Sequence, residues 1–161
     1  MIALTTYFLT FPVRNEAPNF KLREINANGI TSREITLSEL RGKVIFLEFV
    51  AAWCPHCKNM VPTIKELYNE YSSKGVYFLT IAIKDRTATE ELTSEFIKKY
   101  NIDWTVLFDE KGKVFDLYSV KGIPTYYLIN SKGIILSKLS GEHSYEELAQ
   151  LIEEALRRQF K

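Results

Sequence analysis

Hydrophobic residues along the chain form two kinds of pattern, continuous apolar runs and stretches with apolar side chains three and four residues apart. The runs at 44–50 and 76–83 are almost wholly apolar and predict two buried strands. Between them, residues 54–72 have helical spacing. Strand, helix and strand then predict one βαβ unit, whose crossover helix makes the two strands parallel.

The segment before these strands predicts a β-hairpin. Residues 20–25 alternate between apolar and polar, and residues 30–35 do so more weakly. Asn28 and Gly29 lie between the two stretches, and both tolerate the positive φ angles that tight hairpin turns need. Residues 37–42 then predict a single capped turn that is closed by a glycine.

The second half of the chain continues the alternation of helices and strands. Capping-box spacing after Thr87 and again after Ser144 predicts the starts of two helices. The predicted elements are a helix to residue 100, a strand over 104–108, helical turns over 114–118, a hairpin of 126–129 with 134–139, and a helix to about Arg158. We therefore predict one α/β domain with a central mixed β-sheet flanked by helices.

Residues 17–161 are assigned to this domain, and residues 1–16 to a lead-in. The apolar stretch 1–11 has no basic residue and is shorter than the roughly 20 residues that span a bilayer. It is interpreted as the remnant of a signal or membrane anchor, or as an extra edge strand.

Composition narrows the classes of partner. The chain of 161 residues has 21 Lys plus Arg against 20 Asp plus Glu, a net charge of +1. This balance gives no electrostatic reason to expect nucleic acid or an anionic membrane surface as a partner. Two cysteines cannot build a disulfide scaffold, and a chain of this length needs none.

Those two cysteines, Cys54 and Cys57, lie between a strand pattern and a helix pattern, which is typical of a redox dithiol. The unpaired N–H groups and partial positive charge of a helix N-terminus favour Cys54 as the nucleophilic thiolate. Cys57 lies one turn further and would resolve the mixed disulfide formed on Cys54. The alternatives are two inert thiols or half of a zinc site, although zinc takes four ligands and His143 is far away in sequence.

Three residues around the cysteines are expected to tune them: Trp53, Pro55 and His56. The histidine can hydrogen-bond to the Cys54 sulfur or place positive charge near it, which favours the reduced form and makes the disulfide more oxidising. A solvent-exposed histidine with little effect is the alternative.

Glu48 interrupts the apolar strand 44–50. A buried carboxylate is costly unless it is neutral or partnered. A carboxyl group with a raised pKa at this point could accept and return the proton of Cys57 during exchange. The alternative is a charge at the strand end that reaches solvent or Lys43.

Pro124 directly precedes a predicted strand, where proline is normally excluded from pairing. A cis peptide bond in a tight turn would explain this position and would expose backbone groups of Ile123 to a partner strand. An ordinary loop proline is the alternative.

Together these residues resemble the thioredoxin superfamily. Residues 46–58 are similar to its strand-to-active-site signature, residues 122–125 to its cis-proline loop, and Glu48 occupies its buried-acid position. Within the superfamily, segments 17–20 and 37–43 are similar to the N-terminal region of the TlpA/ResA-like thiol–disulfide oxidoreductases.

The resemblance implies a thioredoxin fold with an N-terminal β-hairpin and a strand–helix insertion before the cis-proline. The interval from Cys57 to Pro124 fits that insertion and is too short for the large helical insertion of DsbA. Two features depart from the ResA pattern: Met60 replaces a glutamate, and the Pro-His dipeptide is more typical of oxidising members. A peroxiredoxin is not indicated, because the chain lacks a Pro-x-x-x-Thr-x-x-Cys arrangement.

The resemblance implies an enzyme that exchanges disulfides with protein thiols, more as a reductase than as an oxidase. Its implied catalytic residues are Cys54, Cys57 and Glu48, and Ile123 with Pro124 would dock the partner. No cofactor or metal is expected beyond the redox-active disulfide itself, and an upstream redox partner would recycle it. Alternatives are an oxidising, disulfide-forming enzyme and a copper- or zinc-binding thioredoxin-like module.

We further expect a monomer with no nucleic-acid partner and with membrane contact only through an N-terminal anchor. An extracytoplasmic location, periplasmic or membrane-anchored, is favoured over a cytoplasmic one.

Overall fold

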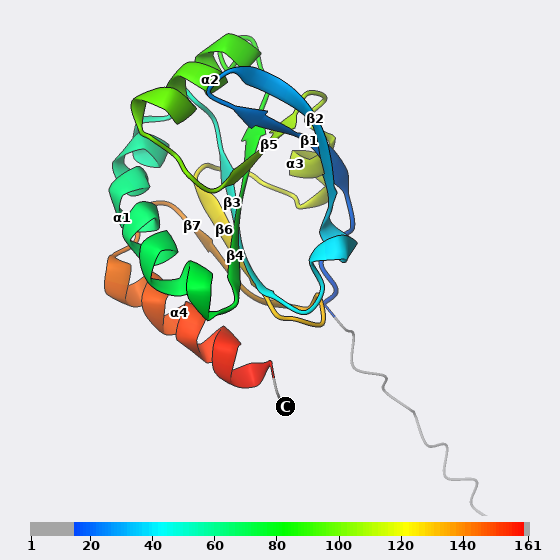
Figure 1. The fold of residues 1–161 in the computed structure, drawn as a ribbon, viewed down its shortest axis with the longest axis vertical. Coiled ribbons are helices and arrows are strands. Elements are labelled where there is room, and N and C mark those ends of the chain that lie inside the picture. Colours follow the sequence, from blue (N-terminus) through cyan, green and yellow to red (C-terminus); the bar gives the residue numbers. More distant parts are fainter. Residues whose placement is uncertain (1–14, 160–161) are drawn as a thin grey trace, which may run out of the picture.

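A seven-stranded mixed β-sheet runs through the computed structural model, which describes residues 15–159 (Figure 1). The strands are β1 Lys21–Asn26, β2 Gly29–Thr36, β3 Val44–Val50, β4 Val76–Ile83, β5 Thr105–Asp109, β6 Thr125–Ile129 and β7 Ile135–Ser140. The helices are α1 Pro55–Tyr71, α2 Glu90–Lys99, α3 Lys113–Leu117 and α4 Tyr145–Arg158, with short 3-10 turns η1 Leu37–Leu40 and η2 Ser72–Lys74.

The strand order is β2-β1-β5-β4-β3-β6-β7. The three central strands β5, β4 and β3 are parallel to one another, and the remaining pairs are antiparallel. The predicted βαβ unit is present as β3, α1 and β4. The predicted α/β fold with a central mixed sheet is therefore confirmed.

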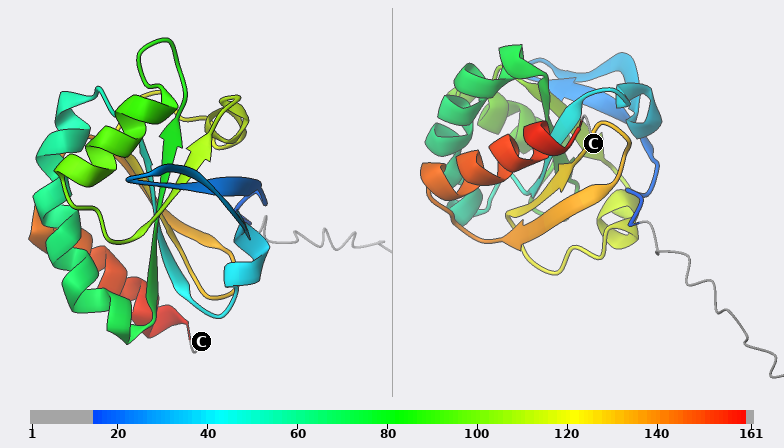
Figure 2. Two further views of the ribbon diagram at one scale, coloured as in Figure 1. Left: turned by 45° about the horizontal axis from the view of Figure 1, so that its top comes forward. Right: turned by 90° about the horizontal axis from the view of Figure 1, so that it is seen from below.

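The sheet separates two apolar cores. Helices α1, α2 and α4 lie on one side of it, and α3, η1 and the segment before β1 on the other (Figure 2). Every residue of β3 is buried, because this strand has neighbours on both edges and helices or loops on both faces. Side chains alternate between the faces along a strand, so the even-numbered residues of β3, Glu48 among them, face α1.

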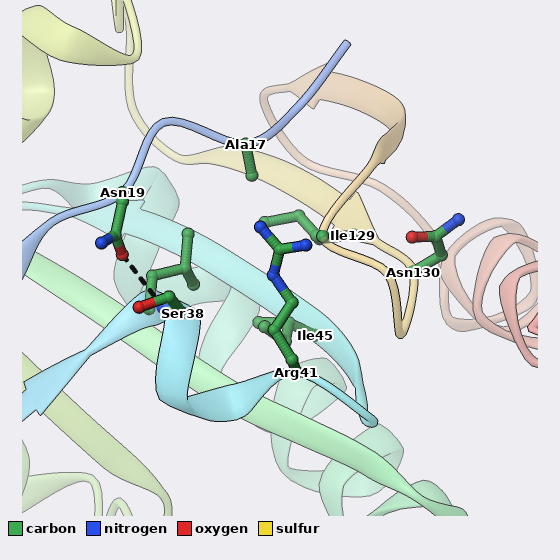
Figure 3. Close-up of a pocket in the computed structure, with 9 residues that line it drawn as sticks. Ala17, Asn19, Ser38, Arg41, Ile45, Ile129 and Asn130 are labelled. Atoms are coloured by element: carbon green, nitrogen blue, oxygen red, sulfur yellow. Dashed lines mark hydrogen bonds between the residues drawn. The ribbon is translucent and has the colours of Figure 1, made fainter. Parts of the chain in front are cut away.

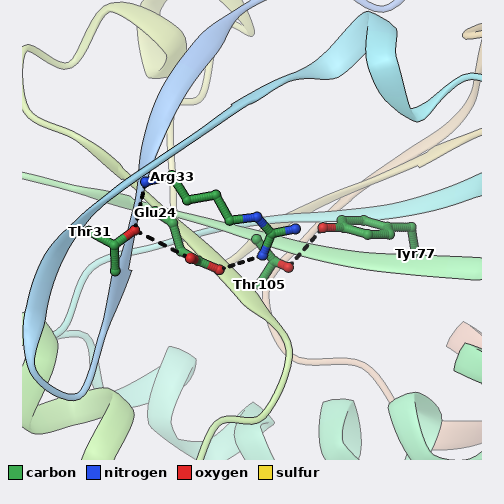
Figure 4. A network of polar contacts seen from close by, with 5 residues as sticks. All are labelled: Glu24, Thr31, Arg33, Tyr77 and Thr105. Atoms are coloured by element: carbon green, nitrogen blue, oxygen red, sulfur yellow. Dashed lines mark hydrogen bonds and ion pairs between the residues drawn. The ribbon is translucent and has the colours of Figure 1, made fainter.

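The N-terminal hairpin closes at Gly29, whose φ of +110° favours glycine. Figure 4 shows the polar contacts that hold its strands together, with Glu24 on β1 bonded to Thr31 and Arg33 on β2 at 3.4 and 3.0 Å. At the tip, the Ile30 N–H donates to Glu90 at the start of α2, 3.0 Å away. The hairpin is thus fastened to a helix on the α1 face of the sheet.

The segment before β1 is held at the end of the sheet where β3 begins. Its backbone bonds to the turn before β7, with Ala17 N–H donating to Gly133 and Ile135 N–H to Asn15, at 2.9 and 2.8 Å. Figure 3 shows the small pocket beside it, where Asn19 accepts from the Ser38 N–H and Arg41 points towards the β6–β7 turn.

Several element bounds differ from the predicted ones by one residue, and the start of α2 differs by two. The N-cap of α2 is Thr89 rather than Thr87, because the N–H groups of Thr87 and Ala88 donate to Asp85 and form a turn of their own. Strand β5 begins one residue late, at Thr105.

The signal, anchor or edge strand predicted over residues 1–11 lies outside the described residues. Within residues 15–159, no helix has both the length and the apolar character needed to cross a membrane.

Replacing Phe49 tests how much the apolar core on the α3 face of the sheet contributes to the free energy of unfolding. Its ring is fully buried and contacts the rings of Phe115, Tyr118 and Tyr127 at centroid distances of 5.0, 5.3 and 5.8 Å. We expect Phe49→Ala to lower the free energy of unfolding by about 3–5 kcal/mol in urea denaturation, through lost burial and an added cavity. Leu117→Ala, at a residue that is 48% exposed, is the control and should change it by less than about 0.5 kcal/mol.

Candidate active site

Cys54 is the N-cap residue of α1. Its backbone is extended, and its Sγ accepts a hydrogen bond from the Cys57 N–H at 3.3 Å. Pro55 follows at the first helical position, where its missing N–H leaves no donor unpaired. The sulfur of Cys54 therefore takes the place that a serine or aspartate oxygen usually fills at a helix N-terminus.

Cys57 lies one turn into α1 and is almost fully buried, with 1% of its surface exposed. Both cysteines are free thiols in the structure. The pKa of Cys57 is raised well above its ordinary value, first by burial, then by the neighbouring Cys54 thiol and by the charge of Glu48. Cys57 is thus a protonated thiol that needs a base before it can react.

The loop before β6 faces Cys54 from the other side. The Ile123–Pro124 peptide bond is cis, and the Cys54 thiol donates to the Ile123 carbonyl at 3.7 Å. Thr125 anchors the loop by donating to the Gly122 carbonyl at 2.6 Å. The backbone of Ile123 therefore lies against the sulfur of Cys54.

Glu48 is buried on β3, on the same face of the sheet as Cys57. Its Oε2 accepts a hydrogen bond from Thr80 of β4 at 2.9 Å. Burial raises its pKa from 4.5 to about 7, although the Thr80 hydroxyl acts in the opposite direction. The side chain reaches neither solvent nor Lys43, whose ammonium lies over the ring of Tyr77.

Trp53 lies on the surface next to the dithiol and is 42% exposed. Its indole Nε1–H donates to Asp85 Oδ2 at 2.9 Å, in the loop after β4. Burial alone would raise the pKa of Asp85, but hydrogen bonds from Ala88, Trp53 and Thr87 outweigh it, and the net pKa is lowered. A charged carboxylate thus fixes the orientation of the indole.

The side chain of His56 is 68% exposed. Its Nδ1 lies 2.7 Å from Glu142 Oε1, in the loop between β7 and α4, and Asn59 Nδ2 donates to the same oxygen at 3.0 Å. These two contacts, the one with His56 first, lower the pKa of Glu142. Of the two ways in which the sequence suggested that His56 acts on Cys54, the hydrogen bond is not formed, because the ring nitrogen Nδ1 is bonded to Glu142 instead. What is left is an effect through charge, or little effect.

A metal ion would need further ligands beside the two thiols. Within the described part of the chain, no three His, Cys, Asp or Glu side chains gather closely enough to hold one. His143 lies at the N-terminal end of α4, where it contacts the Ser140 carbonyl and Glu147. Among the described residues, the two thiols therefore have no third His, Cys, Asp or Glu side chain grouped with them.

The structure brings together most of the residues that the sequence singled out: Cys54, Cys57, Glu48, Trp53, Ile123 and Pro124. Two side chains that contact them were not predicted: Thr80, which donates to Glu48, and Asp85, which accepts from Trp53. Two more were missed around these: Trp104, which donates to Thr80, and Glu142, which contacts His56. Of these, Thr80 has a signal in the sequence, because it is the polar residue at the centre of the apolar run 76–83.

Comparisons with known proteins match the chain to one family and to relatives named thiol-disulfide oxidoreductases. Residues 13–138 match the AhpC/TSA family. Over 136 residues the chain is 34% identical to a thiol-disulfide oxidoreductase ResA of Bacillus cereus, a match that covers 84% of this chain and 74% of the relative.

Two solved structures of related proteins have a similar fold. One is a protein assigned as the thiol:disulfide interchange protein DsbE from Chlorobium tepidum, with a TM-score of 0.79 at 30% identity over 88% of this chain and 96% of that one. Another is StoA from Bacillus subtilis, with a TM-score of 0.71 at 26% identity over 84% and 96% of the two chains.

The raised pKa of Glu48 predicts a pH-dependent stability. Between pH 4.5 and about 7, the folded protein keeps a proton on Glu48 that the unfolded chain releases, so stability falls as pH rises through this window. In Glu48→Gln this loss is absent. The free energy of unfolding of the variant relative to wild type should therefore increase by on the order of 3 kcal/mol from about pH 4 to about pH 8 in urea titrations.

Glu66→Gln, at an exposed position on the same helix as the dithiol, is the control and should show a constant difference over that range. A constant difference for Glu48→Gln as well would contradict the raised pKa.

Proposed function

The chain belongs to the AhpC/TSA family and to the thiol–disulfide oxidoreductases of the ResA type, and on this premise we propose that it reduces protein disulfides through Cys54 and Cys57. The observation that carries this proposal is the placement of the Cys54 sulfur. It caps a helix N-terminus, accepts the Cys57 N–H and lies against the carbonyl of Ile123.

In the proposed first step, the Cys54 thiolate attacks one sulfur of the partner's disulfide. A bond forms between Cys54 Sγ and that sulfur, the partner's S–S bond breaks, and the departing thiolate takes a proton from solvent. The helix N-terminus supports the thiolate, because the Cys57 N–H donates to the sulfur and the helix dipole favours negative charge there. An extended partner chain would lie along Ile123 and Pro124, with Trp53 beside it.

In the second step, Cys57 gives its proton to Glu48, and the resulting thiolate attacks Cys54 Sγ. The Cys54–Cys57 disulfide forms, and the bond between Cys54 Sγ and the partner breaks. The partner sulfur that was bonded to Cys54 leaves as a thiolate with the electron pair of that bond. Two electrons have then passed to the partner, and an upstream thiol donor must restore the dithiol. A carboxyl with a pKa of about 7 is suited to take and return this proton near neutral pH.

The contact of His56 with Glu142 supports the reducing direction. A positively charged histidine beside Cys54 would stabilise the thiolate and make the disulfide a stronger oxidant. Glu142 places a negative charge 2.7 Å from that ring and so offsets its field at the sulfur. Cys54 then keeps the helix N-terminus as its main source of stabilisation.

Separate replacements of the cysteines test the two chemical roles. We expect Cys54→Ser to abolish reduction of insulin disulfides, because the attacking sulfur is lost. Cys57→Ser should instead accumulate a mixed disulfide on Cys54, visible by mass spectrometry and released by dithiothreitol. Trapping on Cys57 in the Cys54→Ser variant would reverse the assigned roles, and tight stoichiometric Cu⁺ or Zn²⁺ binding without exchange activity would favour a metal-binding module.

The reduction potential tests the direction, measured by equilibration with glutathione. A value of about −270 mV, typical of thioredoxin, supports a reductase, and a value of about −120 mV, typical of DsbA, supports an oxidase. Removing the charge of Glu142 makes the surroundings of Cys54 more positive, so Glu142→Gln should shift the potential upward by roughly 10 mV, the scale of an exposed charge pair.

Glu147→Gln is the matched control, because Glu147 contacts His143 instead of His56. An unchanged or more negative potential in Glu142→Gln would contradict the offsetting role of this carboxylate.

A further inference from the structure

Three buried polar side chains form a chain of hydrogen bonds across the sheet beneath the dithiol. The indole Nε1–H of Trp104 donates to Thr80 Oγ1 at 2.9 Å, and Thr80 Oγ1 donates to Glu48 Oε2 at 2.9 Å. Trp104 directly precedes β5, Thr80 is on β4 and Glu48 on β3, so the chain crosses the three parallel strands in order. Neither Thr80 nor Trp104 has a part in the exchange steps above.

The chemistry of the three groups fixes the direction of both bonds. An indole N–H can only donate, so Thr80 Oγ1 must accept from Trp104. The threonine hydroxyl has one hydrogen, which it gives to Glu48 Oε2. A proton on Oε2 would reverse the second bond and leave the threonine hydrogen buried without an acceptor, which is unfavourable. The proton of a neutral Glu48 therefore belongs on Oε1.

Packing holds this arrangement in place. The Trp104 ring contacts that of Tyr68 on α1 at a centroid distance of 5.6 Å, and Tyr68 in turn contacts Phe78 of β4 at 5.6 Å. The β-branch of Thr80 limits its χ1 rotamers, so the hydroxyl cannot easily turn away. The helix that positions Cys57 thus also positions Trp104.

We infer that Thr80, oriented by Trp104, is a positioning residue that keeps Oε2 of Glu48 as an acceptor and directs proton exchange with Cys57 to Oε1. This inference rests on the proposed proton transfer from Cys57 to Glu48. In that transfer the S–H bond of Cys57 breaks, its proton binds Oε1, and its electron pair forms the bond to Cys54 Sγ while the partner sulfur leaves as thiolate.

The titratable neighbours of Glu48 do not obscure its titration. Cys57 on α1 and Tyr126 on β6 both respond to its charge, and burial is the main cause that raises the pKa of each above its ordinary range. Both therefore stay protonated near neutral pH. The hydroxyl of Tyr126 is buried without a hydrogen-bond partner among the described residues, so it does not replace Thr80 as a donor.

The test is the titration of the Glu48 carboxyl carbon by ¹³C NMR in the reduced protein, together with the pH profile of the resolving step. Thr80→Val keeps the shape of the side chain and removes the hydroxyl that favours the charged carboxylate. We expect its Glu48 midpoint, and the pH at which resolution is half-maximal, to rise together by about one unit. Thr80→Ser keeps the hydroxyl and should titrate close to wild type.

Trp104→Phe removes the indole donor but leaves Thr80 in place, and should shift the midpoint in the same direction by less. This variant and Thr80→Ser decide the question if Thr80→Val does not fold. Equal midpoints in wild type, Thr80→Val and Trp104→Phe would overturn the inference.

Glu48→Gln separates this inference from the proposed function. If its resolving step keeps the wild-type pH profile, Glu48 is not the base, and the positioning role falls with it. If Glu48→Gln loses the pH dependence while Thr80→Val retains the wild-type profile, only the positioning role of Thr80 is refuted.

Discussion

A carboxyl group buried on an inner strand of the sheet is the constraint on which the site depends. Glu48 is paired in register with Thr80 of β4 on one side and with Tyr126 of β6 on the other, and α1 covers it. Because water cannot solvate it there, its proton is held up to a pH of about 7. The cost of burying this group is tolerable only if a hydrogen-bond donor is well placed beside it, and among the described residues Thr80 is that donor. The neighbouring strand β4 therefore has a chemical as well as a structural role.

The elements and residues that form the site could be predicted, because each is marked by a pattern within a short stretch of the sequence. The continuous apolar run 44–50 has the bounds of β3, and the change to helical spacing after it places Cys54 at the start of α1. Glu48 stands out as a carboxylate in an apolar strand, and Pro124 as a proline directly before one. Each of these residues contradicts the pattern around it, and such contradictions are visible in a single sequence.

The contacts of the site could not be predicted, because they join residues that are far apart in the chain. Asp85 and Glu142 lie in loops 32 and 86 residues from Trp53 and His56, and polar residues in loops are too common to stand out. Thr80 is an intermediate case. It occupies the same position in β4 as Glu48 does in β3, which parallel pairing turns into a contact once the register is known.

The dithiol and the entry of the chain into the domain lie at opposite ends of the sheet. Because β6 runs antiparallel to β3, Ile129 lies beside Ile45, where β3 begins, and Thr125 beside Phe49, near the dithiol. The backbone of Asn15 and Ala17 is bonded to the turn after Ile129, so the chain enters the domain at the end of the sheet opposite Cys54. Any support attached upstream of Asn15, whether a bead or a fused domain, would therefore join the described domain at the end of the sheet away from the dithiol.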